Sequence, residues 1–481
     1  MIQRESNPLP QSTVTRLLLI PTSSTENPIC DVEIATPADI DIAVKAARAA
    51  FNNPSWRDLI PEDRAKLLHK LADLVEENLE ELFTLQAWDV GKPFPSSMEG
   101  EGAHMLGTLR YFAGWADKLH GRTIPVSKDK FGYTIKQPVG VCAGISPWNY
   151  PLTNSSWKLG PALTTGNCII LKPSEHSPLA ALYLAKLCKE AGYPPGVVQV
   201  VNGYGNKTGE ALTTHIDIDK VAFTGSTNTG RRIIQAAAVN MKKTSIEAGG
   251  KSAFIVFEDA DLEQAAKWAI AGGLGNSGQI CSANSRILVQ ADVEENFLKI
   301  FTEMANASKI GQPFDRDTTQ GPQASKMQYD KILGYIHGAK EDGAKLITGG
   351  NPFQNPSGKG YFIQPTIFSG VTRDMKIFQE EVFGPILTVS TFKTEEEAVA
   401  LANDSTYGLA AMVFTENLKK AHNTAAKLQT GMVWINESNN TDYKLPFGGF
   451  KQSGLGRDLG EDALAEYVEE KVIHVNLGMQ L

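Results

Sequence analysis

The residue best suited to covalent chemistry is Cys281, which lies in the segment Ser277–Arg286. A thiolate is a strong nucleophile, and a helix that began beside the sulfur would lower the thiol pKa and favour that form. Glycines crowd positions 272–278 and allow a backbone or a ligand to come close. These glycines favour a reactive thiol at this position. The competing interpretation is a small buried apolar side chain, which is what most lone cysteines are.

Glu247 is a candidate general base, and it is the one charged residue in the run Thr244–Gly250. A carboxylate in an apolar strand is disfavoured unless it is solvated, paired or placed for function. If Glu247 is buried beside a cleft, desolvation raises its pKa toward neutrality, as a general base requires. The alternative is an ordinary surface residue, and this segment alone leaves both interpretations open.

Asn149 is a candidate hydrogen-bond donor, because Pro147 and Pro151 bracket it and proline restricts the backbone on both sides. A side-chain amide held in this way is suited to an oxyanion, and such a donor stabilises a transition state by about 3 kcal/mol. Asparagine is also common in ordinary turns, which is the simpler interpretation of the segment.

Two glycine clusters compete as phosphate sites, Gly203–Gly209 and Phe223–Gly230, and neither has the standard dinucleotide fingerprint. We favour the second because it opens a predicted helix, whose N-terminus attracts a pyrophosphate, with Ser226 as a hydroxyl donor. Lys172 and Glu175 follow another predicted strand. Lys172 is placed to hold a phosphate or ribose and Glu175 to accept from ribose hydroxyls, although a solvated loop pair is equally compatible.

Alternating strands and helices must position these residues. Strands are predicted at 141–146, 168–171, 197–201 and 220–224, with helices between them. This alternation gives a parallel sheet covered on both faces, and ligands bind beyond the carboxyl ends of its strands. A second α/β block is predicted near Ala253, with a strand at 252–257, a helix at 262–274 and a strand at 287–289.

The segments outside these blocks are predicted less regularly. Helical spacing indicates helices at Ala38–Phe51 and Pro61–Phe83. The opening, to about Ala35, is rich in Pro, Ser and Thr and is expected to be irregular. The β-rich pieces Gly121–Val139 and Tyr467–Asn476 fit neither block, and each reads as a strand or hairpin that pairs with an outside partner.

The composition excludes several classes of protein. The 481 residues suggest two or three domains, and 46 basic against 54 acidic residues give a net charge of −8 with no basic cluster for nucleic acid. Five cysteines without a CxxC pair argue against a disulfide framework or a metal site and for a reducing compartment. No apolar run is long enough to span a membrane. We therefore expect a cytoplasmic protein with no nucleic-acid, membrane or metal partner.

In this order, the segments resemble the aldehyde dehydrogenase superfamily, in its hydrolytic, NAD(P)-dependent form. The resemblance runs from about Pro37 to Val475, and the spacing of Glu247 and Cys281 also matches. Together the ordered motifs make a specific pattern. They are Pro147–Pro151, Lys172–Glu175, Phe223–Gly230, Glu247–Lys251, Gly278–Arg286, Glu380–Pro385 and Pro446–Arg457.

The resemblance implies a mechanism. Cys281 attacks the aldehyde carbon, the Asn149 side chain and the Cys281 backbone N–H hold the oxyanion, and hydride transfer leaves a thioester. Glu247 then activates the water that releases the acid. It also implies the residues that bind the cofactor, which are Trp148, Lys172, Glu175, Gly225, Ser226, Gly230, Glu381 and Phe383. Because a carboxylate at Glu175 repels a 2′-phosphate, NAD is favoured, with NADP as the alternative.

The resemblance further implies a substrate tunnel lined by Tyr150, Asn154, Trp157, Ile280 and Phe447. Asn154 and its neighbour Thr153 stand where apolar tunnel residues are usual, and the loop Glu437–Leu445 is polar. A polar mouth favours an aminoaldehyde. The Ile280–Ser282 triplet and the pair of Tyr150 and Trp157 resemble the betaine and aminoaldehyde branch, which is the alternative for the substrate class. Gly275 and Phe447 depart from that branch, and a full cation-binding aromatic box is not expected.

The expected fold is three-part. A Rossmann-like NAD-binding domain covers residues 1–118 and 140–249, an α/β catalytic domain 250–450, and a small β oligomerisation extension 119–139 and 451–481. The extension is expected to pair with a neighbouring subunit in a homodimer or homotetramer. The region before the first helix is abbreviated relative to the family's usual strand pair, so little N-terminal structure is expected.

Three rival functions remain distinguishable. An acylating dehydrogenase passing the thioester to coenzyme A is disfavoured because Glu247 is retained. A non-catalytic protein with this fold would be signalled by loss of Cys281, Glu247 or Asn149, and none is lost. A cysteine hydrolase would need a histidine near the thiol, and none of the eight histidines lies in a motif.

Overall fold

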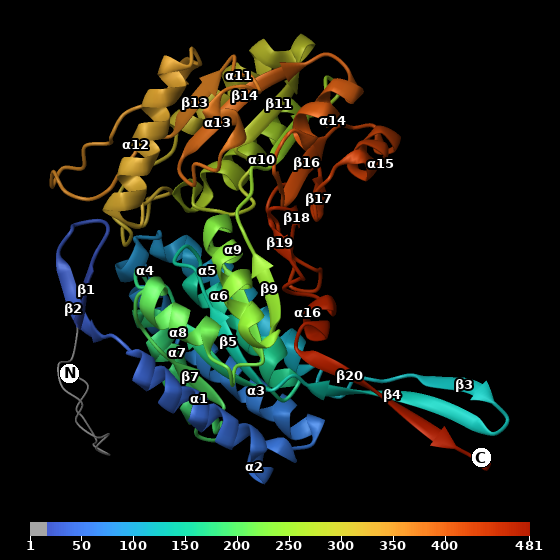
Figure 1. Cartoon of the computed structure of the whole chain (residues 1–481). Helices are drawn as coiled ribbons and strands as arrows, with labels where there is room; N and C mark the ends of the chain where they lie inside the picture. The colour runs from blue at the N-terminus through green and yellow to red at the C-terminus, as the bar shows by residue number, and fades with distance from the viewer. Residues whose placement is uncertain (1–16) are drawn as a thin grey trace.

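The computed structural model describes residues 17–481 as two α/β domains with a projecting antiparallel arm (Figure 1). The domain drawn lower contains a six-stranded sheet in the order β19-β9-β8-β5-β6-β7, parallel except for β19 at one edge. Its strands are β5 (Val141–Ile145), β6 (Cys168–Lys172), β7 (Val198–Val200), β8 (Lys220–Thr224), β9 (Lys243–Glu247) and β19 (Gly454–Leu455).

Two helices of this domain begin at clear sequence signals. Thr36 and Asp39 form a capping box for α1, and Pro151 is the first residue of α6. Every residue of α6 is buried, because it packs against β5 and β6 on one side and α5 on the other. The helices are α1 (Pro37–Asn52), α2 (Pro54–Arg57), α3 (Pro61–Glu77), α4 (Leu79–Val90), α5 (Phe94–Ala113), α6 (Pro151–Thr164), α7 (Leu179–Ala191), α8 (Glu210–Thr214) and α9 (Thr227–Ala237).

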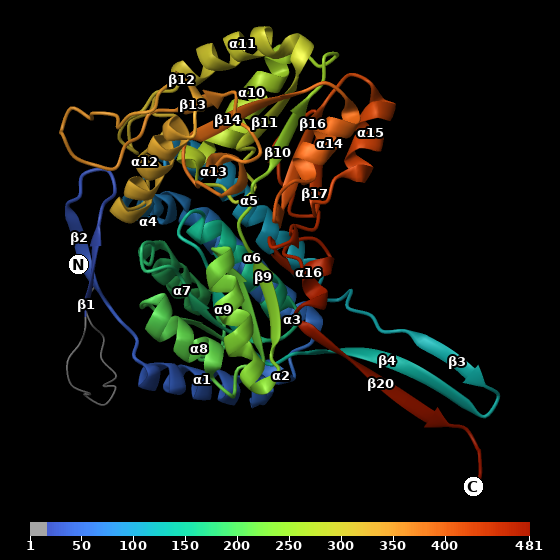
Figure 2. The same cartoon turned by 45° about the horizontal axis from the view of Figure 1, so that its top comes forward.

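The second domain contains a seven-stranded sheet in the order β12-β13-β14-β11-β10-β16-β17, parallel except for β12. One apolar cluster packs α10 and α11 on one face, and another packs α12, α13 and α14 on the other (Figure 2). The strands are β10 (Ala253–Val256), β11 (Arg286–Gln290), β12 (Lys345–Thr348), β13 (Thr366–Ser369), β14 (Ile386–Phe392), β16 (Ala410–Phe414) and β17 (Met432–Ile435). The helices are α10 (Leu262–Leu274), α11 (Glu294–Asn306), α12 (Lys326–Glu341), α13 (Lys376–Gln379), α14 (Glu395–Asn403) and α15 (Leu418–Lys427).

The predicted α/β fold class is confirmed, and the predicted strands lie within a residue or two of those observed. One helix prediction was wrong, because Pro61–Phe83 is divided between α3 and α4. The break falls at Asn78, whose backbone leaves the helical region at φ −119° and whose side-chain amide donates to the Leu74 carbonyl at 2.8 Å. An asparagine side chain that bonds a backbone carbonyl of the preceding turn competes with the helix in this way.

The arm is a three-stranded antiparallel sheet in the order β20-β4-β3, from β3 (Thr123–Ser127), β4 (Lys130–Pro138) and β20 (Val468–Asn476). The predicted boundary at residue 451 was wrong. Between 451 and 467 the chain pairs β18 (Phe450–Lys451) with β15 (Tyr407–Gly408), adds β19 to the sheet of the lower domain, and forms α16 (Asp462–Ala465). The backbone donors of this segment find partners in the body of the protein, so it does not extend with the arm.

The N-terminal expectation was also wrong for the residues that the structure describes; residues 1–16 lie outside them. A strand pair forms, β1 (Leu17–Pro21) with β2 (Pro28–Glu33). Its turn is closed by the Thr22 hydroxyl, which accepts from the Ser24 N–H at 3.2 Å. The turn also meets the upper domain, because the Tyr361 N–H donates to the Ser23 carbonyl at 3.1 Å. Hydroxyl-bonded turns of this kind make a Ser- and Thr-rich stretch regular.

Candidate active site

The two sheets face each other through opposite ends of their strands. In the lower domain, Asn149 follows β5, Lys172 ends β6 and Glu247 ends β9, so all three lie at the carboxyl edge. In the upper domain, Cys281 precedes β11 and Phe383 precedes β14, so both lie at the amino edge. The fold therefore brings together residues that are far apart in the sequence.

A single cavity of about 1200 Å³ lies where these edges meet. Gly230 does not line it. That glycine is buried in α9, where an added Cβ would lie 2.9 Å from Ile246 Cγ2, so it allows α9 to pack closely on β9. The other residues predicted for the site do line the cavity, and these are Trp148, Asn149, Tyr150, Asn154, Trp157, Lys172, Glu175, Gly225, Ser226, Glu247, Ile280, Cys281, Glu381, Phe383 and Phe447.

Cys281 is reached through a strained turn. Asn276 and Ser277 have left-handed backbones, with φ of 48° and 57°, and such non-glycine residues cost about 1–3 kcal/mol each. Ser277 is held by its hydroxyl, which donates to the Gly321 carbonyl at 2.9 Å. A Cβ on Gly250 would lie 2.5 Å from the Cys281 carbonyl, so the glycine is needed for this approach.

No described helix starts beside the sulfur. Among the described residues, Cys281 lies in a loop between a short 3-10 turn and β11. Burial raises the pKa of the thiol to about 12, and the charges of Glu381 and Glu247 add to the effect. The resting sulfur is therefore protonated, and a base must remove its proton when it reacts.

Glu247 is buried in the cavity wall, with 3% of its surface exposed. Neither carboxylate oxygen has a hydrogen-bond partner among the described residues. Burial, together with the Asp458 charge, raises the pKa of Glu247 well above its usual value, while Lys158 opposes the shift. A buried carboxylate without partners and with a raised pKa is suited to accept a proton from a molecule in the cavity.

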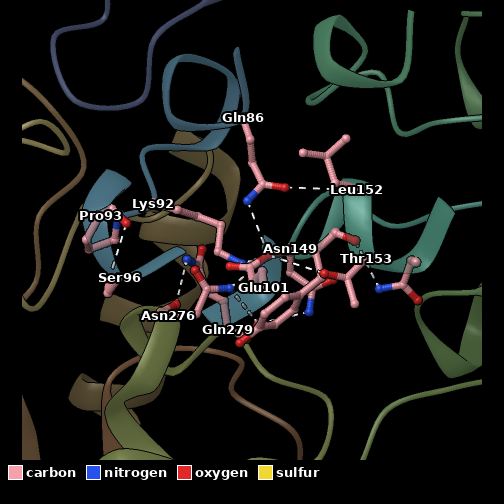
Figure 3. Close-up of polar contacts among 12 residues, drawn as sticks. Gln86, Lys92, Pro93, Ser96, Glu101, Asn149, Leu152, Thr153, Asn276 and Gln279 are labelled. Carbon is pink, nitrogen blue, oxygen red and sulfur yellow. Dashed lines mark hydrogen bonds and ion pairs between the residues drawn. The ribbon is translucent and has the colours of Figure 1, made fainter. Parts of the chain in front are cut away.

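Asn149 is fixed at both its ends (Figure 3). Its side-chain Nδ2 donates to the Gln279 carbonyl at 2.9 Å, which ties the turn to the loop that carries Cys281. Its own carbonyl accepts from Lys92 Nζ at 2.9 Å and from Asn276 Nδ2 at 3.1 Å. An amide has two N–H groups, so one remains for a ligand in the cavity.

One end of the cavity presents polar groups that fit a dinucleotide. Lys172 is buried and Lys172 Nζ lies 3.8 Å from Glu175 Oε2, so the two form a pair rather than a solvated loop. Gly225 and Ser226 precede α9, and the Ser226 hydroxyl caps the helix by accepting from the Thr229 N–H at 3.3 Å. Both glycine clusters reach this end, because residues 205, 206 and 209 line it as well.

Glu381 and Phe383 form the wall between this end and Cys281. Glu381 Oε1 accepts from the Gly250 N–H at 3.0 Å, and burial raises the pKa of that carboxyl to about 7. Phe383 has a left-handed backbone, φ 64°, held by Gln328 Nε2 donating to its carbonyl at 2.8 Å. Its ring packs edge-on against Trp148 with centroids 5.3 Å apart. The two rings meet nearly at right angles and form an apolar corner suited to a nicotinamide.

The opposite end is an aromatic passage with polar gaps. The rings of Trp157 and Phe447 lie 4.8 Å apart, and Trp157 Nε1 donates to His104 Nε2 at 3.0 Å. Asn154 donates to the Tyr150 carbonyl at 3.1 Å, while its Oδ1 has no partner among the described residues. An aldehyde entering this end meets both π faces and a hydrogen-bond acceptor.

Several residues of the site were missed by sequence reasoning. His104 and Glu101 line the passage from α5, and Lys92 lies beneath it. Burial lowers the pKa of His104 to about 4, so it is neutral there, and lowers that of Lys92 to about 8. The available signal for Lys92 was its place between Gly91, a left-handed helix cap, and Pro93, since a charged residue in such a tight break is unusual. His104 gave no signal beyond a helical pattern.

None of the described helices is long and apolar enough to cross a membrane.

Comparison with known proteins agrees with this geometry. The aldehyde dehydrogenase family matches residues 13–473. An aldehyde dehydrogenase of Emericella nidulans is 51% identical over 456 residues, which cover 95% of this chain and 91% of that protein. The NAD+ complex of aldehyde dehydrogenase from Bacillus cereus is 47% identical, with a TM-score of 0.95 over 96% of this chain and 94% of that chain. Betaine aldehyde dehydrogenase from Staphylococcus aureus, also with NAD+, is 40% identical, with a TM-score of 0.95 over 97% and 92%.

The chain therefore belongs to the aldehyde dehydrogenase family. The family, the fold class and the enzyme class predicted from the sequence are confirmed: the protein is a dehydrogenase that oxidises an aldehyde with a nicotinamide cofactor.

Proposed function

We propose that Cys281, Asn149 and Glu247 carry out this oxidation as nucleophile, oxyanion donor and base. The observation that carries the proposal is their convergence in one cavity although they come from different domains. Each also has the environment its role needs. The thiol faces the cavity, the amide keeps one N–H to donate, and the buried carboxylate accepts no hydrogen bond from the residues that the structure describes.

In the first half of the reaction, the sulfur bonds to the aldehyde carbon while its proton passes to a base. The carbonyl electrons move to the oxygen, which Asn149 Nδ2–H and the Cys281 N–H stabilise. The oxyanion then re-forms its double bond as hydride leaves the carbon with its electron pair, and a thioester remains. When bound, NAD supplies the acceptor for that hydride. Trp148, Phe383 and Glu381 would hold the reacting end of the cofactor.

In the second half, Glu247 removes a proton from water as the water oxygen attacks the thioester carbon. The C–S bond breaks, the acid leaves and the sulfur regains a proton. A buried base of raised pKa suits this step, because it holds the proton long enough to return it. Retention of this base also favours water over coenzyme A as the acyl acceptor.

The cofactor end favours NAD over NADP. Lys172, Glu175 and the start of α9 would hold the adenosine and diphosphate part, with Gly225 and Ser226 at the helix N-terminus. Lys172 is already paired with Glu175, so its charge is not free for a 2′-phosphate. The Glu175 carboxylate would repel such a phosphate directly.

The passage favours a small aldehyde that carries a polar group. Glu101, His104, Asn154 and the backbone near Thr441 interrupt its aromatic lining. A quaternary ammonium is less favoured, because Lys92 Nζ already lies 3.3 Å from the centroid of the Tyr150 ring. A repelling cation beneath one wall weakens the aromatic attraction for a second.

The arm supports a homo-oligomer. Every residue of β3 is exposed, and β20 leaves the outer edge of the three-stranded sheet without a partner within the described chain. Open edges of this length are usually covered by another chain. We propose a homodimer or homotetramer assembled through the arm, and a cytoplasmic location consistent with five unpaired thiols.

The test measures the formation of NADH or NADPH by absorbance, with short, long, aromatic and amino aldehydes as substrates. Wild type should reduce NAD with at least one aldehyde, and Cys281→Ala should lose activity by about 10⁴-fold or more. Glu247→Gln should give one burst of reduced cofactor and then stall. An active Cys281→Ala enzyme would refute the assignment of the nucleophile.

A further inference from the structure

Lys92 is buried against the back of the oxyanion turn, with 3% of its side chain exposed. Its ammonium meets three partners, which matches its three hydrogens. Nζ lies 2.6 Å from Glu101 Oε1 and donates to the Asn149 carbonyl at 2.9 Å (Figure 3). It also lies 3.3 Å from the centroid of the Tyr150 ring. Two of these partners are consecutive residues of the turn that presents the Asn149 amide.

The local sequence explains why Lys92 points inward. Gly91 ends α4 with a left-handed backbone, φ 73°, and Pro93 leads directly into α5. Only one residue separates these two fixed points, so the backbone at Lys92 has little freedom. Glu101 lies two turns into α5, and its second oxygen accepts from Gln86 Nε2 at 3.2 Å.

The Asn149 turn is thus held from two domains. Lys92, in the lower domain, donates to the Asn149 carbonyl. Asn276, in the loop of the upper domain that carries Cys281, donates to the same carbonyl. The Asn149 side chain reaches back to the Gln279 carbonyl of that loop. Losing Lys92 would leave the turn anchored from one side only, and the free amide N–H would shift relative to the sulfur.

Stability alone does not account for this pair. A buried ion pair is often no more stabilising than apolar residues of the same volume, because both charges lose their hydration. The directional hydrogen bonds of the Lys92 ammonium instead fix the orientation of the Asn149 turn. Lys92 does not line the cavity, so it acts through the groups it holds.

We propose that Lys92, itself oriented by Glu101, is a positioning residue that sets the Asn149 amide for the oxyanion. The proposal rests on the oxyanion role proposed for Asn149. It predicts that Lys92 matters only while Asn149 is present, which separates it from a general structural role.

The test is a double-mutant cycle of Lys92→Met and Asn149→Ala, with kcat/KM for a good aldehyde and NAD as the readout. A displaced catalytic group costs about 10²-fold, so Lys92→Met should lower kcat/KM by about 10- to 100-fold in the otherwise wild-type enzyme. In the Asn149→Ala background, the same change should cost less than about threefold. Equal losses in both backgrounds would overturn the proposal.

Two further readouts separate positioning from damage. The rate of Cys281 alkylation by iodoacetamide and the dissociation constant of NAD do not need the oxyanion donor, so both should change by less than about threefold in Lys92→Met. Parallel losses in kcat/KM, in the alkylation rate and in the affinity for NAD would show a structural role and overturn the proposal. If the Asn149→Ala enzyme keeps full activity, Asn149 is not the oxyanion donor, and the positioning role of Lys92 is then refuted as well.

Lys220 offers a matched control, because it is also a buried lysine above an aromatic ring. Lys220 Nζ lies 4.8 Å from the Tyr467 centroid and 3.7 Å from Glu466. Lys220→Met should lower the melting temperature as much as Lys92→Met without the kinetic loss. If Lys92→Met does not fold, Glu101→Gln serves instead. This variant keeps a hydrogen bond to Lys92 but removes the charge. It should lower kcat/KM by about three- to tenfold, and this decrease should also disappear in the Asn149→Ala background.

Discussion

The two ends of the cavity meet at Cys281 and are built in different ways. The cofactor end is made by turns that follow neighbouring parallel strands, so sheet topology alone brings Lys172, Ser226 and Glu247 together. The aldehyde end is made by helices α5 and α6 and by the loop before β18, which packing brings together. One substitution at the aldehyde end can change the lining without disturbing a strand order. The lining of the aldehyde end can therefore be altered by substitution without moving the turns that form the cofactor end.

Asn149 stands where the two ends join, and its loss should have the largest effect. Asn149→Ala should lower kcat/KM by about 10²–10³-fold, because the oxyanion loses a preorganised donor. The affinity for NAD, measured by fluorescence titration, should stay unchanged. A weakened NAD affinity with normal turnover would instead place Asn149 at the cofactor end.

Glu247 also lies at the junction and predicts a pH dependence. Because burial raises its pKa, the carboxylate fraction falls as the pH drops below that raised value. Thioester hydrolysis should then slow by about tenfold per pH unit. Rapid-quench measurement of acid release after one turnover isolates this step. Glu247→Gln should be slow at every pH, and an unchanged slope in that variant would assign the titration to another group.

Glu175 should affect only the cofactor end. Glu175→Gln removes the charge that opposes a 2′-phosphate and frees Lys172, so the ratio of kcat/KM for NADP to NAD should rise by about tenfold. Steady-state kinetics with each cofactor measure this ratio. The order of preference among aldehydes should not change, and a change would mean that the ends are coupled.

Asn154 should affect only the aldehyde end. Asn154→Leu replaces an acceptor that has no partner in the described chain with an apolar group of similar size. Preference for straight-chain over hydroxylated aldehydes should rise by about threefold, the worth of one modest hydrogen bond. Competition between paired substrates measures the ratio.

Gly230 should affect neither end. An alanine Cβ there would lie 2.9 Å from Ile246 Cγ2, so Gly230→Ala should lower the free energy of unfolding by about 1–2 kcal/mol through crowding. Denaturant titration measures this loss. An increase of more than about threefold in the dissociation constant of NAD would return Gly230 to the cofactor site.

The sequence predicted most of the first sheet, because strand and helix patterns alternate regularly from β5 to β9. It also predicted that the residues following those strands lie close together, because they all stand at the carboxyl edge of one parallel sheet. The direction of the thiol pKa shift could not be predicted from the glycines near Cys281, because the burial that raises this pKa depends on distant segments such as the loop with Glu381.

Contacts between side chains from different elements could not be predicted from the sequence. Lys92 and Glu101 are separated by a helix start, and nothing in their spacing indicates a pair beneath residue 149. His104 lies among apolar residues of α5 and has the pattern of an ordinary helix face. The strand pair β1–β2 was missed because its turn has no glycine and is closed instead by the Thr22 hydroxyl.

The last part of the chain has a consequence for biosynthesis. β19 pairs with the strand that ends in Glu247, and Asp458 beside it helps set the proton affinity of that base. β20 then closes the arm against β4. On the ribosome, a nascent chain that has already exposed Cys281 still lacks these final residues. The environment of the proposed base and the arm are therefore both completed only after every other residue proposed for the site has been synthesised.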